Sequence, residues 1–199
     1  EMQQVVSHIA DNLIEQIESL NAIASDFSRF AKPIEEEFGD EDLNKILDSI
    51  TQLYQHDKRI FFSTDLSPNP LIIHCAADEL RRVFINLVKN SSEAMPKGGV
   101  IILRSYHHQN KAFVEVVDNG EGIPESAQSK IFVPNFSTKS SGTGLGLAIS
   151  KKIIEAHHGE ISFASVIGAG TTFTIQLPLV EKSKKEQFDD EDNKTSSSA

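Results

Sequence analysis

The residues with the clearest chemical potential lie between Asp118 and Leu147, where two glycine clusters flank a polar segment. An apolar, strand-like run over 112–117 ends at Asp118, and a helix-like run over 145–157 begins inside the second cluster. Glycines let a backbone approach a ligand closely, and the first N–H groups of a helix attract phosphate. The aspartate adds a hydrogen-bond acceptor beside them. This stretch therefore predicts a nucleotide site with a flexible cover.

The common phosphate-binding templates do not fit this stretch. A P-loop needs Gly-Lys-Ser/Thr, which the chain lacks. The dinucleotide fingerprint ends on a third glycine, but after Gly142 and Gly144 that position holds Leu147. The His-Arg-Asp and Asp-Phe-Gly elements of protein kinases are missing. An EF-hand is excluded because Gly120 and Gly122 occupy positions that need oxygen ligands.

A pair of asparagines, Asn86 and Asn90, lies four residues apart in a helix-like segment over 79–95. This spacing puts them on one face, away from the apolar residues Leu80, Val83, Phe84, Leu87 and Val88. An asparagine oxygen can complete a Mg²⁺ shell whose other ligands are phosphate oxygens and water. Alone, such a pair is more typical of a solvated helix face. The neighbouring glycine clusters make it a metal-site candidate.

Several residues of the stretch allow two interpretations. Asp118 can accept a hydrogen bond from an adenine amino group, but Asp-Asn-Gly is also strong turn chemistry. Phe132 and Phe136 fit either the core or a hinge for the cover. Thr138 and Lys139 belong to the cover, where Lys139 would meet a terminal phosphate or simply be an exposed lysine.

Five short motifs in order resemble the N, G1, F, G2 and G3 boxes of sensor histidine kinases, and they occupy residues 86–90, 118–122, 132–139, 142–147 and 168–173. The resemblance covers 43–178 and implies the Bergerat ATP-binding fold, with ATP and Mg²⁺ as cofactors and an ATP lid over 124–143. It implies catalytic roles for Asn86, Asn90 and Lys139, with Asn90 holding the metal. The nucleotide-binding residues implied are Asn90, Asp118, Gly120, Gly122, Ile123, Phe132, Thr138, Lys139, Gly142, Thr143, Gly144, Leu145, Gly146, Leu147 and Thr172.

One position separates a kinase from a hydrolase within this resemblance. Gyrase-type ATPases carry a general-base glutamate four residues before the metal asparagine, and this chain has Asn86 there. An amide cannot take a proton from water. The sequence therefore favours phosphoryl transfer to a histidine, for relay to a response-regulator aspartate. A Bergerat-fold ATPase and a non-catalytic nucleotide- or partner-binding module are the alternatives.

The N-terminal segment has apolar residues at spacings of three and four over 1–31 and ends at Pro33, which predicts a long helix. Its apolar face favours pairing in a homodimer, and the alternative is an ordinary amphipathic helix packed on its own domain. Residues 15–33 resemble the second helix of a dimerisation domain, most of all that of nitrogen-regulation-type sensors. His8 lacks the acidic neighbour and following proline of the family's phosphoacceptor. The acceptor histidine is therefore expected upstream of this chain.

Periodicity and turn residues predict an α+β fold, a two-layer sandwich with helices on one face of a mixed sheet. The expected domains are a dimerisation helix over 1–33, a linker over 34–42, an ATP-binding domain over 43–179 and a disordered tail over 180–199. The expected elements are helices 43–54, 79–95 (capped by Asp78), 126–131 and 144–159, and strands 59–66, 71–75, 100–106, 112–117, 160–166 and 171–177.

Composition limits the remaining function classes. The net charge of −10 over 199 residues argues against a nucleic-acid partner. Cys75 is the only cysteine, so no internal disulfide can form, which fits a reducing compartment. No apolar run approaches the roughly 20 residues of a membrane span. We therefore expect a cytoplasmic protein, or the cytosolic part of an inner-membrane sensor.

Overall fold

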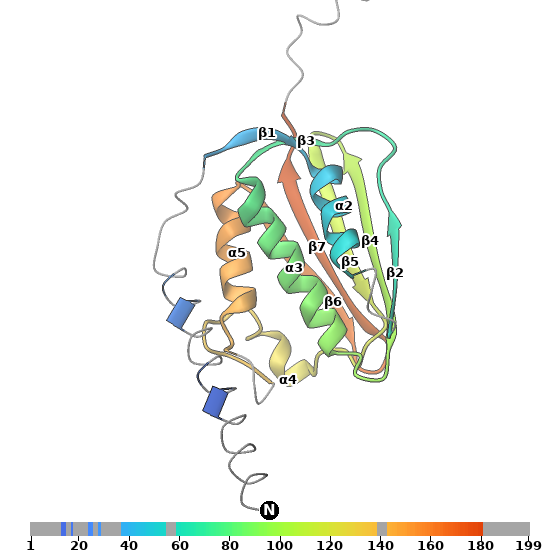
Figure 1. Cartoon of the computed structure of the whole chain (residues 1–199), viewed down its shortest axis with the longest axis vertical. Coiled ribbons are helices and arrows are strands. Elements are labelled where there is room, and N and C mark those ends of the chain that lie inside the picture. Colours follow the sequence, from blue (N-terminus) through green and yellow to red (C-terminus); the bar gives the residue numbers. More distant parts are fainter. Residues whose placement is uncertain are drawn as a thin grey trace, which may run out of the picture.

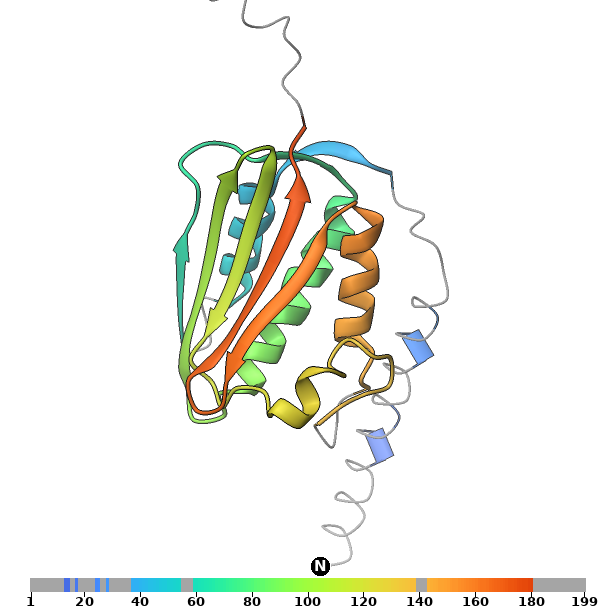
Figure 2. The ribbon, with the colours of Figure 1, turned by 180° about the vertical axis from the view of Figure 1, so that it is seen from behind.

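The computed structural model describes residues 37–54, 59–138 and 143–180, with a few isolated helical positions between 13 and 28. Helices lie over one face of a five-stranded sheet, and Figures 1 and 2 show the two faces. The sheet order is β2-β4-β5-β7-β6, and β1 and β3 form a second ladder. The elements are β1 (Gly39–Asp42), α2 (Leu43–Tyr54), β2 (Ile60–Asp65), β3 (Ile72–Cys75), α3 (Ala77–Glu93), β4 (Gly99–His108), β5 (Lys111–Asp118), α4 (Glu125–Gln128), α5 (Gly146–Ala156), β6 (Glu160–Val166) and β7 (Gly170–Pro178).

The core lies between the sheet and the helices α2, α3 and α5. Alternate residues of β4, β5 and β7 are buried, because successive side chains of a strand point to opposite faces. The apolar stripe predicted for α3 is fully confirmed, since all five of its residues are buried. The predicted two-layer α+β sandwich and both predicted hairpins, β4–β5 and β6–β7, are therefore confirmed.

The predicted strands β2 and β3 both form, and each pairs with a different partner. These strands do not pair with each other: β2 runs parallel to β4, and β3 pairs antiparallel with β1. Half of the predicted linker over 34–42 is therefore a strand. In β1, Asp40 and Glu41 are exposed, so this short strand has no alternating apolar pattern to reveal it. The N–H of Val180, predicted to open the tail, donates to Ile72 O at 2.9 Å.

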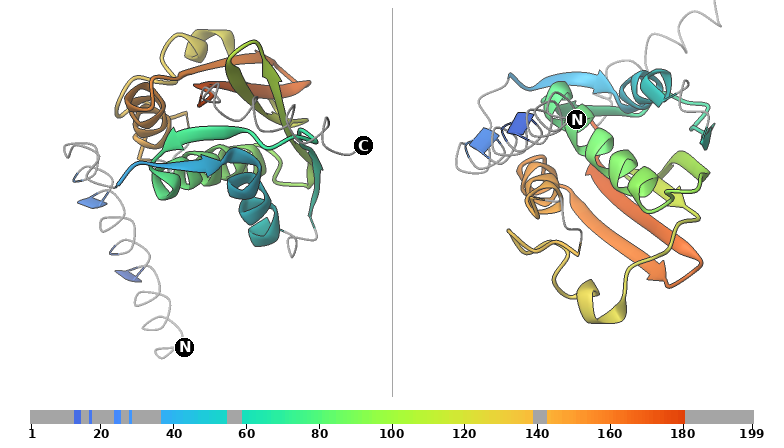
Figure 3. Two further views of the ribbon diagram at one scale, coloured as in Figure 1. Left: turned by 90° about the horizontal axis from the view of Figure 1, so that it is seen from above. Right: turned by 60° about the horizontal axis from the view of Figure 1, so that its bottom comes forward.

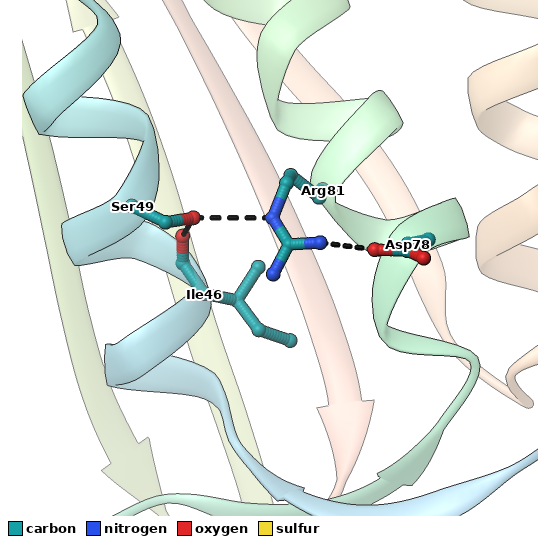
Figure 4. Close-up of polar contacts among 4 residues, drawn as sticks. All are labelled: Ile46, Ser49, Asp78 and Arg81. Atoms are coloured by element: carbon teal, nitrogen blue, oxygen red, sulfur yellow. Dashed lines mark hydrogen bonds and ion pairs between the residues drawn. The ribbon is translucent and has the colours of Figure 1, made fainter.

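Two helix details were predicted wrongly. Leu53 continues the three-and-four spacing of Leu43, Ile46, Leu47 and Ile50, which predicts a place on the core face of α2, but it is 61% exposed. Tyr54 takes the last core position instead and stacks on Phe62, with ring centroids 6.1 Å apart. Asp78 was expected to cap α3, but the helix begins one residue earlier, at Ala77. Asp78 lies in the first turn and pairs with Arg81 (Figure 4).

Arg81 links the two neighbouring helices α2 and α3 (Figure 4). Its Nε donates to Ser49 Oγ at 3.2 Å, and that hydroxyl donates to Ile46 O at 2.6 Å. The guanidinium is thus held from both sides, by Asp78 on its own helix and by Ser49 on the other. This polar bridge lies beside the buried apolar contact between α2 and α3.

Most of the predicted N-terminal helix lies outside the described residues, as does the tail over 181–199. The described positions between 13 and 28 are helical, and Leu13, Ile14 and Ile17 are more than half exposed. Dimerisation through this segment stays a prediction. Among the described residues no helix is long and apolar enough to cross a bilayer.

The start of α3 is capped by a histidine from another helix. His157, at the end of α5, is 2% exposed and accepts the Ala76 N–H through Nε2 at 3.0 Å. Its Nδ1 lies 2.7 Å from Ile153 O and must donate, which fixes the neutral tautomer. Phe38 stacks on the ring at a centroid distance of 4.8 Å. Burial lowers the pKa of His157, against weaker opposing contributions from Ile153 and Glu79.

This arrangement predicts a pH-dependent stability. As pH falls through 6.5, the ordinary pKa of histidine, His157 becomes protonated in the unfolded chain but stays neutral in the folded chain. The free energy of unfolding should then fall with pH, by at most about 1.4 kcal/mol per pH unit from this residue. Urea unfolding between pH 7.5 and 5.5 should give a flatter profile for His157→Gln than for the wild type. His107→Gln, at an exposed histidine, should keep the wild-type slope, and a His157→Gln profile parallel to the wild type would refute the assignment.

Candidate functional site

Three segments predicted to act together meet at one end of the domain. The C-terminal half of α3, the end of β5 and the start of α5 lie there, with α4 beside them (Figures 1 and 3). Hydrogen bonds join them in pairs: Ser91 of α3 contacts Asp118 of β5, and Asn86 of α3 contacts Ser150 of α5. The N-box, G1 and G2 motifs are therefore neighbours in space.

Asp118 is a buried carboxylate, 6% exposed, with donors from three parts of the chain. Its Oδ1 accepts the N–H groups of Gly120 at 3.0 Å and Thr171 at 3.1 Å. Its Oδ2 accepts the Ser91 hydroxyl at 2.8 Å. Buried charge is costly unless hydrogen-bonded, so these contacts are what allow an aspartate here. Thr171 in turn contacts Ser165 through its hydroxyl at 2.9 Å.

Asn86 holds the start of α5 against α3. Its Nδ2 donates to Ser150 Oγ at 2.9 Å, and Ser150 donates to Gly146 O at 3.0 Å. A Cβ on Gly146 would lie 2.5 Å from Asn86 Oδ1, so the glycine permits this close approach. Asn86, predicted as catalytic, is thus engaged with the protein itself and positions the helix terminus.

The N-terminus of α5 can meet an anion. Leu145 precedes the helix and provides no side-chain cap, and its buried side chain belongs to the core. Among carbonyls of the described residues, the first one in this helix to be reached by an N–H is that of Leu145, which accepts from Ile149 at 2.8 Å. The earlier N–H groups, those of Gly146 and Leu147 included, are the ones a helix leaves for a ligand such as phosphate. Thr143 accepts the Leu145 N–H at 3.3 Å.

Asn90 fits the metal role that the sequence predicted, as one ligand among others. It is half-buried and next to Ser91, and its side chain makes no hydrogen bond to another described residue. The described part of the chain contains no cluster of His, Cys, Asp and Glu able to hold a metal ion alone. A lone amide oxygen suits Mg²⁺, which is commonly bound through few protein ligands plus substrate phosphates.

The glycines predicted to line the nucleotide are required first by the protein's own packing. An added Cβ would lie 2.9 Å from Ala94 Cβ at Gly120, 2.3 Å from Val166 O at Gly122 and 2.7 Å from Asn135 C at Gly144. Gly144 also has φ +69°, which side-chain-bearing residues rarely adopt. These contacts let the two loops pack closely around the carboxylate and the helix terminus.

The predicted lid over 124–143 is anchored in its first half. Ala127 and Ile131 are buried, and Phe132 packs edge-on against Phe163 at a centroid distance of 6.0 Å. Phe132 and Phe136 both pack against the core, which favours the core interpretation of these phenylalanines. Thr138 is exposed, whereas Lys139 and Gly142 lie outside the described residues.

Two further predicted binding residues have clear positions. The N–H of Ile123 donates to Ser165 Oγ at 2.8 Å, and its carbonyl accepts from Gln128, so the loop after Asp118 is fixed to β6 and α4. Thr172 alternates with the buried residues of β7 and lies on the face opposite Asp118. Its neighbour Thr171 is the residue in contact with the carboxylate.

Sequence reasoning missed Ser91, Ser150 and Thr171. A usable signal existed for Ser91, which continues the apolar stripe of α3 and is therefore a polar residue at a core position. Thr171 precedes the alternating apolar residues of β7 in the same phase. Ser150 lies one turn after Gly146, where a hydroxyl can bond the preceding turn.

The described histidines lie at the other end of the domain. His108 pairs with Lys111, seven residues along β5 from Asp118, or about 24 Å at ~3.4 Å per residue. His157 ends α5, roughly 16 Å from the start of that helix. His74 is on β3, before α3 begins. These rings move with the domain and do not approach the start of α5.

The close packing of Asn86 and Gly146 gives a testable prediction. Gly146→Ala should destabilise the fold by about 1–3 kcal/mol, because its methyl group overlaps Asn86. In an Asn86→Ala background the same change should cost almost nothing. Urea unfolding of the four proteins of this double-mutant cycle measures the coupling. Gly39→Ala, which has nothing within 4 Å of its Cβ, is the matched control. Equal costs of Gly146→Ala in both backgrounds would contradict the contact.

Comparisons with known proteins agree on one family. The family model described as "Histidine kinase-, DNA gyrase B-, and HSP90-like ATPase" matches residues 75–181. Sporulation kinase C of Bacillus subtilis (strain 168) is 34% identical over 177 residues, which are 85% of this chain and 40% of that protein. The histidine-protein kinase AtoS of Escherichia coli (strain K12) is 34% identical over 171 residues, 84% of this chain and 28% of that protein. The chain thus spans less than half the length of these relatives.

Solved structures agree with the sequence relatives. The catalytic domain of histidine kinase ThkA superposes with a TM-score of 0.66 at 35% identity, covering 72% of this chain and 96% of that one. ThkA in complex with the response regulator protein TrrA gives a TM-score of 0.71 at 29% identity, covering 84% of this chain and 49% of that one.

Proposed function

Because the chain belongs to the family of histidine kinase-, DNA gyrase B- and HSP90-like ATPases, we propose that it binds Mg-ATP where α3, β5 and α5 meet. Within that family it carries the ATP-binding catalytic domain of a sensor histidine kinase. We propose further that it transfers the γ-phosphoryl group to a histidine of a dimerisation domain. The observation that carries the proposal is the meeting of Asp118, Asn90 and the uncapped start of α5 at one end of the domain.

Each ATP group has a matching residue in this proposal. The Asp118 carboxylate accepts a hydrogen bond from the adenine amino group. The α5 N-terminus, from Gly146 onward, binds phosphate oxygens through its N–H groups and helix dipole. Asn90 supplies the amide oxygen for Mg²⁺, which when bound neutralises phosphate charge. Thr138, Lys139 and Gly142 of the lid are proposed to close over the phosphates.

The chemistry of the Asn86 side chain favours phosphoryl transfer over hydrolysis. Its amide is bound to Ser150, and an amide cannot accept a proton from water. A histidine nucleophile needs an in-line approach and charge neutralisation more than a strong base, because catalysis of phosphoryl transfer is mainly positioning. In the transfer, the bond between γ-phosphorus and the bridging oxygen breaks as a ring nitrogen bonds to phosphorus.

The wider setting is also proposed. The phosphoryl group then passes to an aspartate of a response regulator, a proposal supported by the solved complex of ThkA with TrrA. The N-terminal helix is proposed to form the dimer, and its resemblance to nitrogen-regulation-type sensors stays a prediction. We also propose that the domain works in the cytoplasm, where ATP is available, either free or as part of a membrane-anchored sensor.

Incubation with γ-labelled ATP tests the function. The chain alone should show no acid-labile phosphohistidine, because its described histidines lie at the far end of the domain and His8 lacks the acidic neighbour and following proline of a phosphoacceptor. A separately produced histidine-bearing dimerisation helix of a sensor kinase should become labelled in the presence of Mg²⁺. Asn90→Ala should lower that transfer by about 100-fold, the usual loss for one group that stabilises developing charge. Removal of the metal with a chelator should abolish it.

Asn110→Ala, in the distant turn between β4 and β5, is the matched asparagine control and should transfer at the wild-type rate. Free phosphate released from ATP is measured in parallel. Phosphate release that exceeds transfer would favour the ATPase alternative. Transfer that persists without Mg²⁺, or efficient labelling of His74, His107 or His157, would contradict the proposed kinase site.

A further inference from the structure

Ser91 is a buried hydroxyl directly beside the candidate nucleotide site. It is 1% exposed and follows Asn90 on α3, but its side chain lies on the opposite side, toward the sheet. Its only hydrogen-bond partner among the described residues is the Oδ2 of Asp118, at 2.8 Å. None of the roles discussed above uses this hydroxyl beyond satisfying a buried charge.

Counting acceptor sites shows what the hydroxyl leaves open. An ionised carboxylate offers about four lone-pair sites and no donor. Two are taken on Oδ1 by the N–H groups of Gly120 and Thr171, and one is taken on Oδ2 by Ser91. The site that remains is on Oδ2. Any further partner of Asp118 must therefore donate a hydrogen bond to this oxygen.

The two backbone donors cannot rotate away, because Gly120 belongs to the packed loop and Thr171 to the β5–β7 ladder. They fix which oxygen faces them. The Ser91 hydroxyl then fixes the direction of the last free lone pair on Oδ2. The two backbone donors therefore orient the carboxylate, and the Ser91 hydroxyl orients its unused acceptor site.

We propose that Ser91 is a positioning residue that presents the free acceptor of Asp118 to the 6-position of a purine, and so makes the site select a 6-amino over a 6-oxo base. The inference rests on the proposed binding of ATP at this site. A 6-amino group donates to Oδ2. A 6-oxo group, as in inosine and guanine, places an acceptor against an acceptor and leaves both unpaired, which is the stronger form of discrimination.

The hydroxyl has a second property that sharpens the proposal. A serine can donate or accept, and it rotates to suit its partner. In Asp118→Asn the amide oxygen would still accept from Gly120 and Thr171, which places the NH₂ group where Oδ2 was. Ser91 would then accept one amide hydrogen, and the other would face the purine. The structure thus predicts that this variant reverses the preference of the site toward a 6-oxo base.

The experiment measures calorimetric Kd values in Mg²⁺ for three triphosphates that differ at the purine 6-position: ATP (amino), purine riboside triphosphate (hydrogen) and inosine triphosphate (oxo, which also carries a hydrogen on N1). The wild type should bind them in that order of decreasing affinity. Ser91→Ala should weaken ATP about tenfold, the size of one hydrogen bond to a charged group, and leave purine riboside triphosphate within about twofold of the wild type. Asp118→Asn should bind inosine triphosphate more tightly than ATP.

Two further variants complete the design. Ser91→Thr keeps the hydroxyl and should retain the wild-type ratio of ATP to purine riboside triphosphate. Ser92→Ala makes the same chemical change one residue later on α3, at a side chain with no hydrogen bond to another described residue, and should also retain that ratio. Unchanged binding of purine riboside triphosphate by Ser91→Ala also shows that this variant is folded.

The possible failures can be told apart. The inference would be overturned, and Ser91 would have a purely structural role, if Ser91→Ala weakened the binding of all three nucleotides equally. The same conclusion would follow if Ser91→Ala did not fold and Ser91→Thr had an altered ratio of ATP affinity to purine riboside triphosphate affinity. Failure of Asp118→Asn to reverse the preference would overturn it as well. A wild type that binds none of the three triphosphates would instead refute the proposed function, and with it this inference.

Discussion

The Asp118 carboxylate is the constraint around which this end of the domain is built. A charge buried to 6% exposure needs donors, and it obtains them from α3, from the loop after β5 and from β7. These segments are distant in sequence, with Ser91 and Thr171 on either side of the aspartate. Meeting the hydrogen-bond needs of one carboxylate thus brings the helix that carries Asn90 next to the end of β5, where we propose that the base binds. The same contacts leave a single acceptor site for a ligand.

A second set of contacts positions the start of α5, the proposed phosphate end of the site. Asn86, one turn before Asn90, bonds Ser150 and packs against Gly146, which sets where α5 begins. The helix terminus, the amide oxygen and the carboxylate are therefore held by two adjacent turns of α3. At the opposite end, His157 caps α3 and Phe38 stacks on it, just before β1. The described chain thus enters β1 at the end of the domain away from the candidate site.

Sequence patterns predicted the elements whose periodic burial gives a periodic apolar pattern in the sequence. The stripe of α3 and the alternation of β4, β5 and β7 follow directly from a helix and strands packed on one core. The strand β1 was missed because its exposed acidic residues show no alternation, and Leu53 was misplaced because the stripe of α2 passes to Tyr54. In the candidate site, Asp118 and the glycines were singled out because the two glycine clusters flank a polar segment next to a strand end and a helix start. Ser91 was missed because its partner is distant in sequence, and Thr171, whose N–H contacts the carboxylate, was not named although its neighbour Thr172 was.

The central claim is that one end of the sandwich, set by α3, binds Mg-ATP as a unit. A titration of the ¹⁵N-labelled chain with a non-hydrolysable Mg-ATP analogue, followed by amide chemical shifts, tests it most directly. The largest shifts are expected at Asn90, Ser91 and Gly120, at residues 143–148 and at Thr171, with little change at the β4–β5 turn around Asn110. Shifts centred on that turn or on the β1–β3 ladder, or spread evenly over the domain, would contradict it.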